Sequence, residues 1–123
     1  MSRDRRSNRL GRQLQAELGA IIENDLDDPR IGSVVVTGVR LSRDLAHARV
    51  FVHSVSAGGD PGKLIAGLES ARGFLRRQLG LRLAHLRKIP DLGFSYDTSV
   101  DAGSRVEELL SELDLDDSAD PNG

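Results

Sequence analysis

The stretch LIAGLESARGFLRRQLG, residues 64–80, decides the fold because two helical patterns meet inside it. Between them stands Ala71-Arg72-Gly73, and a glycine within a helix costs about 1 kcal/mol relative to alanine. We therefore predict two helices joined by a kink at Ala71 and Gly73, the second of which continues to Pro90. The apolar residues at helical spacing on either side of the kink are Leu64, Ile65, Leu68, Leu75, Leu79, Leu83 and Leu86.

Strand patterns flank this helix pair on both sides. Residues 33–42, SVVVTGVRLS, are rich in β-branched side chains, and residues 46–55, AHARVFVHSV, alternate with a period of two. The short polar turn between them predicts an antiparallel hairpin with one buried face. Residues 91–97, DLGFSYD, alternate in the same way and predict a third strand, with Phe94 and Tyr96 on the side of the helices.

A further helix is expected at each end of this core. The first contains the N-terminal arginines and ends at NDLDDPR, residues 24–30, because the proline cannot continue it. The last is a short helix with a capping box at its start, Ser104–Leu113. Residues 114–123 are acidic and lack aromatic side chains, so we predict a domain of residues 1–113 followed by a disordered tail.

This order of elements predicts an α+β fold in which helices cover one face of a three-stranded sheet. The strand–helix–helix–strand order from Ala46 to Asp97 is the core topology of a KH domain, which binds single-stranded nucleic acid through a GXXG loop. Here the kink takes the place of that loop. A literal GXXG, Gly59-Asp60-Pro61-Gly62, precedes the helix pair. Its aspartate would repel phosphate and its proline has no N–H to donate, so we predict a strand-to-helix turn.

The composition excludes several classes of protein. The chain has 123 residues, 38% of them hydrophobic and none of them cysteine, which fits one small domain without disulfides or thiolate metal sites. No apolar run approaches the roughly 20 residues of a membrane span. The N-terminus lacks the apolar segment of a secretory signal. We therefore expect a cytoplasmic protein with no membrane partner.

The net charge of −2 hides a segregation of charge along the chain. Seven of the 19 acidic residues lie from Glu107 onward, where no basic residue occurs. The preceding residues therefore hold all 17 basic residues against 12 acidic ones. A basic body with an acidic end suggests a polyanionic partner, and an ordinary solvated surface is the alternative.

The basic residues concentrate on the second helix of the pair and on the first helix of the chain. No acidic residue occurs from Ala71 through Pro90, and small residues and cations share one face of the predicted helix. Such a face lets a phosphodiester backbone approach while guanidinium groups pair with phosphate oxygens. The alternative is a solvated amphipathic helix. The predicted RNA-binding residues are Arg72, Arg76, Arg77, Arg87 and Lys88, followed by Arg5, Arg6, Arg9 and Arg12.

The sequence contains no constellation typical of an enzyme or a metal site. His47 and His53 fall on one face of a strand and His85 stands alone, without the spacing of a metal-binding pair. The aspartates of residues 24–30 lack the glycine and closing glutamate of a calcium loop. No Gly-x-Ser-x-Gly nucleophile elbow occurs. We therefore predict no catalysis, no metal and no cofactor.

Recognition by shape and backbone is expected in place of base stacking. The chain has three Phe, one Tyr and no Trp, and Phe94 and Tyr96 are assigned to the core. Few aromatic rings then remain for stacking of the kind seen in RRM domains.

Most of the chain, from about Arg6 to Leu113, resembles the bacterial ribosome-binding factor A family. Each motif alone is weak, and the resemblance rests on their order and spacing. They are the Asp-Pro-Arg turn of residues 28–30, the Ser-Arg-Asp-Leu turn of residues 42–45, the Ala-x-Gly kink at Ala71 and Gly73, and the pattern Pro-x-Leu-x-Phe-x-x-Asp of residues 90–97.

The resemblance implies a type II KH-like fold and a non-enzymatic factor that binds the free 30S ribosomal subunit late in its maturation. It further implies support of 16S rRNA processing at the 5′ end, contacts with 16S rRNA near the decoding region and the neck, and a role in cold adaptation. Release with the help of a ribosome-associated GTPase is also implied. We expect the protein to act as a monomer.

Two other functions fit parts of the same pattern. A general KH-like protein that binds single-stranded RNA would use the same kinked helix pair on mRNA or small RNA. A helix-turn-helix regulator would place that pair on DNA, but nothing in the sequence suggests the dimer that a palindromic operator requires.

Overall fold

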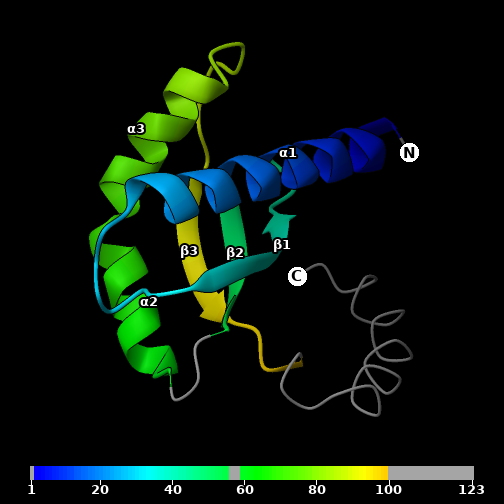
Figure 1. The fold of residues 1–123 in the computed structure, drawn as a ribbon. Coiled ribbons are helices and arrows are strands. Elements are labelled where there is room, and N and C mark those ends of the chain that lie inside the picture. Colours follow the sequence, from blue (N-terminus) through cyan, green and yellow to red (C-terminus); the bar gives the residue numbers. More distant parts are fainter. Residues whose placement is uncertain (1, 56–58, 100–123) are drawn as a thin grey trace.

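The computed structural model describes residues 2–55 and 59–99 (Figure 1). Within these residues the helices are α1 (Ser2–Asp25), α2 (Pro61–Ser70) and α3 (Arg72–Arg82), and the strands are β1 (Val34–Leu41), β2 (His47–Ser54) and β3 (Asp91–Tyr96). No helix in this part of the chain is long and apolar enough to span a membrane. The predicted helix Ser104–Leu113 and the predicted tail 114–123 lie outside the described residues.

The three strands form one mixed sheet in the order β1-β2-β3. β1 and β2 pair antiparallel, as the hairpin pattern predicts, whereas β2 and β3 pair in parallel. A parallel pair needs a long crossover connection, and α2 and α3 supply it. Figure 1 shows α1 crossing the strands while α2 and α3 follow one another along one side of the sheet.

A bulge in β1 keeps alternate apolar residues on the core face of the sheet both before and after it. The register shifts between Val36 and Gly38, which leaves Thr37 as the extra residue. Without the shift, every side chain after it would turn to the opposite face. The residues that pack on the core side are Val34 and Val36 before the bulge, and Val39 and Leu41 after it.

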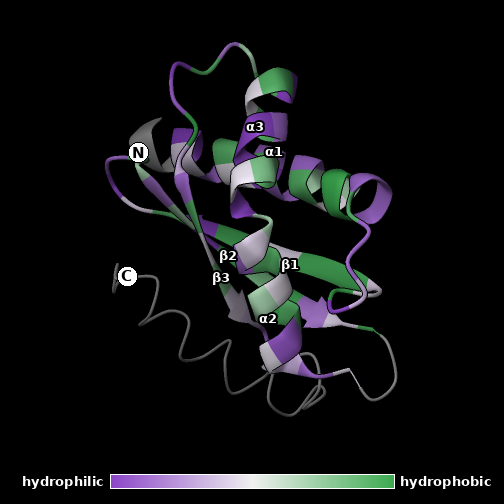
Figure 2. Ribbon diagram, turned by 90° about the vertical axis from the view of Figure 1, so that its left-hand side faces the viewer, coloured by the Kyte–Doolittle hydropathy of each residue, from purple (hydrophilic) through white to green (hydrophobic). Residues whose placement is uncertain are grey.

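All three helices pack on the same face of the sheet, which confirms the predicted α+β architecture. The buried core joins residues of α1, α2 and α3 to β-strand residues that share this face, among them Val50, Val52 and Phe94. Each helix carries both hydrophobic and hydrophilic residues, as amphipathic helices do (Figure 2). Tyr96 also packs against this core, as predicted.

The literal GXXG sequence is the predicted strand-to-helix turn. Asp60 is the N-cap of α2, and its Oδ1 accepts hydrogen bonds from the N–H groups of Gly62 at 2.9 Å and Lys63 at 3.4 Å. Pro61 occupies the first position of the helix, where a missing N–H costs nothing. These amides are therefore already satisfied and are not available to a phosphate.

Asp97 ties the bulge in β1 to the end of β3. The Thr37 hydroxyl donates to Asp97 Oδ2 at 2.6 Å, and the hydroxyl and N–H of Ser99 donate to Oδ1 at 2.6 and 3.0 Å. Partial burial raises the pKa of Asp97, but the hydrogen bonds from Ser99 and Thr37 outweigh burial, so the pKa lies below its usual value. The ionised carboxylate therefore stabilises the fold.

Asp97→Asn is expected to lower the free energy of unfolding by about 1 kcal/mol at pH 7, because an amide has a single acceptor oxygen. The native carboxylate has a lowered pKa, so its contribution is present above about pH 4 and is lost as the pH falls through the folded-state value. Urea unfolding between pH 7 and pH 2 should therefore show a smaller acid-side loss in this variant.

The matched control is Asp27→Asn, which neutralises an exposed carboxylate after α1. This control should keep the acid-side loss of the unsubstituted protein. Identical pH profiles for Asp97→Asn and the unsubstituted protein would contradict the assignment.

Candidate nucleic-acid interface

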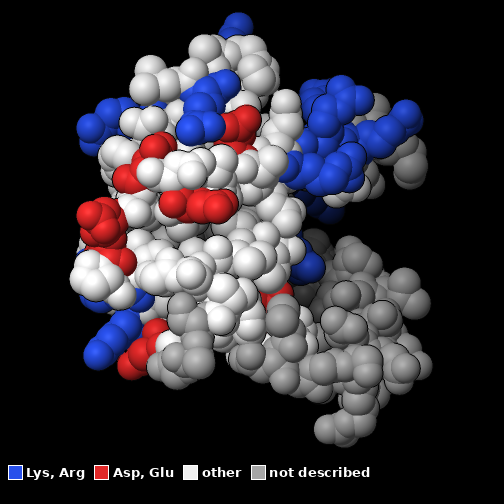
Figure 3. All heavy atoms as spheres, in the orientation of Figure 1, with Lys and Arg blue, Asp and Glu red and all other residues white. Residues whose placement is uncertain are grey.

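The predicted RNA-binding residues lie in two groups on different elements. The α1 cluster consists of Arg5, Arg6, Arg9 and Arg12, and the α3 cluster consists of Arg72, Arg76, Arg77, Arg87 and Lys88. Figure 3 shows basic side chains gathered over the N-terminal half of α1. The helix α3 itself packs beside the other half of α1, where its Arg82 pairs with Glu17 and Asp25. Arg9 of the α1 cluster is therefore separated from Glu17, the partner of Arg82, by a helix rise of roughly 12 Å.

The second helix of the pair ends at Arg82, earlier than the predicted end at Pro90. Leu83 is its C-cap, and the chain then runs through turns and irregular backbone to β3. The connection brings Asp91 beside His47, which the parallel pairing of β3 with β2 requires. Arg87 and Lys88 therefore lie on this connection and do not continue the helical face of Arg77.

Arg76 holds the connection against α3. Its Nη2 donates to the carbonyl of Ile89 at 2.9 Å and its Nε to the carbonyl of Pro90 at 3.3 Å. Its Nη2 also lies 3.6 Å from Asp91 Oδ1. These bonds satisfy backbone carbonyls of the connection, which have no helical partner because α3 ends at Arg82. The guanidinium of Arg76 therefore has a structural role in the free protein.

Counter-charges reach the α3 arginines from other parts of the sequence, although none stands among residues 71–90. Arg72 pairs with Glu69 at 3.0 Å and also donates to the carbonyl of Leu92 at 3.4 Å. Arg82, which the sequence places beside the leucine stripe, pairs with Glu17 at 3.0 Å and so joins α3 to α1. The absence of nearby acidic residues was therefore a poor guide to which arginines are unpaired.

The remaining members of both clusters are exposed and have no ion pair within the described residues. They are Arg77 on α3, Arg87 and Lys88 on the connection, and the whole α1 cluster. Unpaired guanidinium groups can form bidentate hydrogen bonds with phosphate oxygens without first breaking a native ion pair. These seven cations are the part of the predicted site that is free to bind an anion.

The predicted kink between the helices is present at Ala71. This residue is both the C-cap of α2 and the N-cap of α3, with φ −89° and ψ 3°, and its N–H bonds to the carbonyls of Gly67 and Leu68. Gly73 lies inside α3, and a Cβ built there would meet nothing within 4 Å. The glycine is therefore not needed for packing in the free protein, and it leaves open space beside Arg77 and Arg72 on the helix surface.

Cations on the β1–β2 hairpin are not among the predicted RNA-binding residues. Arg40 on β1, Arg43 in the turn and Arg49 on β2 are all exposed. The alternation of the second strand already placed Arg49 away from the core, but only the pairing of the strands brings it beside Arg40. These residues lie on the face of the sheet that the helices leave open.

The acidic residues after α1 form a turn, as predicted. Asp28 accepts side-chain hydrogen bonds from Nε and Nη2 of Arg30, the shortest at 2.7 Å, and these bonds hold the pKa of Asp28 below its usual value. Within the described residues no group of three or more His, Cys, Asp or Glu could hold a metal ion.

The three histidines differ in their exposure. His47 and His85 are exposed, but His53 is only 8% exposed because the ring of Tyr96 and the end of β3 cover it. Its Nδ1 lies 3.3 Å from the carbonyl oxygen of Asp97. This histidine is therefore part of the packing at the end of the sheet.

Comparison with known sequences identifies similar proteins over most of the chain. Residues 6–110 match the family model described as "Ribosome-binding factor A". The chain is 47% identical over 107 residues to the ribosome-binding factor A of Nitrosospira multiformis, which covers 87% of this chain and 84% of that protein. It is 40% identical over 114 residues to that of Aromatoleum aromaticum, with coverage of 93% and 89%.

Solved structures of similar proteins share this fold. The crystal structure of ribosome-binding factor A from Thermus thermophilus superposes with a TM-score of 0.66 at 29% identity, over 73% of this chain and 93% of that one. A Thermus thermophilus homology model, fitted into the cryo-EM map of a complex of ribosome-binding factor A with 30S, gives a TM-score of 0.60 at 29% identity, over 71% and 90%.

Arg76→Gln is expected to lower the free energy of unfolding by about 1 kcal/mol, because two charge-assisted bonds to backbone carbonyls are lost at a partly exposed site. Arg77→Gln, its neighbour on the same helix, should change it by less than about 0.5 kcal/mol. Urea denaturation of the two variants tests this difference. Equal midpoints would show that Arg76 does not hold the connection.

Two helical glycines should respond in opposite ways to alanine. Gly73→Ala is expected to raise the free energy of unfolding by up to about 1 kcal/mol, because the site is helical and open. Gly67→Ala should lower it by about 1 kcal/mol or more, since the new Cβ would lie 2.9 Å from Ile31 Cγ1. Thermal unfolding measures both. A destabilising Gly73→Ala would mean that the kink requires glycine.

Proposed function

The chain belongs to the ribosome-binding factor A family, and we propose that it binds the small ribosomal subunit by electrostatic contacts with 16S rRNA. The observation that carries the proposal is that seven of the predicted RNA-binding residues are exposed and have no ion-pair partner in the described residues: Arg5, Arg6, Arg9, Arg12, Arg77, Arg87 and Lys88. Phosphate contacts of this kind give affinity and orientation, and their strength depends on salt.

The difference between arginines that have partners in the fold and arginines that have none supports this proposal. Arg72, Arg76 and Arg82 are held by carboxylates and carbonyls, so they shape the helix pair and its connection to β3. Arg77 and the other unpaired cations contribute nothing comparable to the fold. Their exposure without counter-charges is consistent with a polyanionic partner such as rRNA.

The similar protein from Thermus thermophilus supports the choice of partner. Its coordinates were fitted into the map of a complex with 30S, and they superpose on 71% of this chain. By analogy, the present chain would meet the same particle through the same fold. The unpaired cations of α1 and of the α3 region would then face rRNA.

The proposal extends to a role in assembly without catalysis. In this account the protein holds an immature conformation of 16S rRNA near the decoding region and the neck, and no bond is made or broken. It acts late in maturation of the subunit, supports processing at the 5′ end, matters most in the cold, and leaves with the help of a ribosome-associated GTPase. It would do so as a cytoplasmic monomer. These finer points derive from the resemblance to the family.

Charge reversal in the α3 region tests the proposal. The variant with Arg77→Glu, Arg87→Glu and Lys88→Glu should fold normally, because all three side chains are exposed and unpaired in the described structure. Its co-sedimentation with purified 30S subunits should fall at least about tenfold. Unchanged co-sedimentation would remove the α3 region from the interface.

Lys63→Glu serves as the control for the charge reversal at Lys88. Both reverse one exposed lysine, but Lys63 lies at the start of α2, at the opposite end of the helix pair (Figure 1). The control should bind 30S as the unsubstituted protein does.

Cross-linking followed by sequencing of the bound RNA separates the proposal from a general RNA-binding role: dominance of precursor 16S rRNA supports it, and a spread over mRNA would contradict it.

A further inference from the structure

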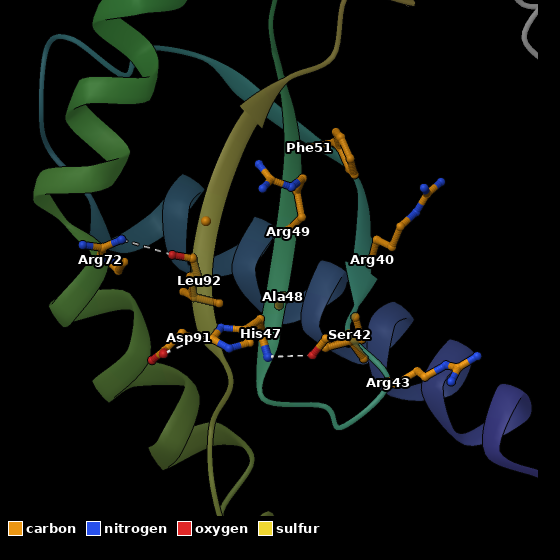
Figure 4. Close-up of a pocket in the computed structure, with 12 residues that line it drawn as sticks. Arg40, Ser42, Arg43, His47, Ala48, Arg49, Phe51, Arg72, Asp91 and Leu92 are labelled. Atoms are coloured by element: carbon orange, nitrogen blue, oxygen red, sulfur yellow. Dashed lines mark hydrogen bonds and ion pairs between the residues drawn. The ribbon is translucent and has the colours of Figure 1, made fainter. Parts of the chain in front are cut away.

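The face of the sheet opposite the helices carries a basic hollow. We call it the sheet hollow; its volume is about 690 Å³ and its lining includes Arg40, Arg43, Arg49, Phe51 and Arg72. Figure 4 shows their side chains on β1, β2, the turn between these strands and the start of α3. No described residue of α1 lines it. The hollow is therefore separate from the cations of the α1 cluster.

Two arginines lie directly opposite one another across the antiparallel pair. Arg40 on β1 and Arg49 on β2 are register partners, and both are exposed. Like charges in this position destabilise a sheet. Arg49 donates to the Ser95 hydroxyl at 2.7 Å, which is a neutral partner, and Arg40 has no ion pair within the described residues. A bound anion would relieve this repulsion.

The acidic groups around the hollow do not neutralise it. Asp91 is the one carboxylate among its lining residues, and this group already faces Arg76 at 3.6 Å and His47 at 3.9 Å. Asp44, next to Arg43, accepts hydrogen bonds from the Ser42 hydroxyl at 2.7 Å and the N–H of Ala46 at 3.1 Å. Both carboxylates are therefore engaged in holding the strands and the turn.

Phe51 places an aromatic ring among these cations. The ring is half-buried on the open face and does not belong to the core that the helices cover. Its register partners are Gly38 on β1 and Ser95 on β3, so the positions on either side are small. A Cβ at Gly38, or at Gly93 nearby on β3, would meet nothing within 4 Å. The space beside the ring is thus open to a planar ligand.

We propose that the sheet hollow binds a single-stranded segment of RNA. One base stacks on Phe51 while the flanking phosphates pair with Arg40 and Arg49, a combination that is typical of surfaces for single-stranded nucleic acid. A duplex keeps its bases stacked and cannot offer one to the ring. A second copy of this chain is disfavoured, because two faces of the same positive charge would meet.

This inference goes beyond the proposed function, because it concerns the opposite face of the sheet and needs no ribosome. It also revises the expectation drawn from the sequence that base stacking plays no part. That expectation assigned Phe94 and Tyr96 to the core correctly, but it did not consider Phe51.

The test uses the full chain and a fluorescein-labelled, 12-nucleotide adenine-rich RNA, either single-stranded or annealed to its complement. Fluorescence anisotropy should show tighter binding of the single strand. Phe51→Leu should weaken binding about tenfold without changing the salt dependence, because stacking does not involve counterions. Each phosphate contact on a single strand contributes ~0.7 to the slope of log affinity against log salt. The double variant Arg40→Gln with Arg49→Gln loses two such contacts, so the magnitude of its slope should fall by about 1.4.

Urea denaturation shows whether each variant is folded. Neutralising Arg40 should not lower the stability of the sheet, because the like-charge pair is removed. The proposal is overturned if all the variants bind single-stranded RNA like the unsubstituted protein, or if the duplex binds more tightly. It is also overturned if the protein sediments as a dimer that Phe51→Leu dissociates, since the hollow would then be an interface between copies. The α3-region triple variant should keep its affinity for the oligonucleotide while losing 30S, so the two accounts can fail separately.

Discussion

The fold depends on one apolar layer between a single face of the sheet and three helices. Only 38% of the residues are hydrophobic, and the fully buried leucines of α1, α2 and α3 all contribute to this layer. Burying one such side chain contributes about 1.5–3 kcal/mol, so none can be diverted to a second core. The opposite face of the sheet therefore carries no second core, and the many arginines lie at the rims and on that open face.

The arginines are distinguished by their partners and not by their place in the sequence. Arg76, Arg77 and Arg82 all lie on α3. Yet Arg76 bonds to carbonyls of the connection and Arg82 joins α3 to α1, whereas Arg77 is exposed. The same type of side chain thus stabilises the fold at one position and stays available to an anion at the next. This arrangement lets a small domain present a rigid, positively charged surface.

The architecture could be predicted because it is encoded locally. Alternation predicted the strands to within about one residue at each end, and helical spacing predicted the break at Ala71. The end of α3 could not be predicted, since Leu83 and Leu86 continue the helical spacing and the connection is held by distant bonds from Arg76. The counter-charges of the arginines and the Arg40–Arg49 pair likewise depend on contacts between remote segments, including a bulge that resets the register.

The central claim is that the unpaired cations bind rRNA electrostatically while the paired ones maintain the fold. The most direct test is the affinity of the protein for purified 30S subunits, measured from about 50 to 300 mM KCl. If five or more phosphates are neutralised, log affinity should fall with log salt with a slope of about −4 or steeper. A slope near zero would contradict the account, because binding would then rest on contacts other than those of the unpaired arginines.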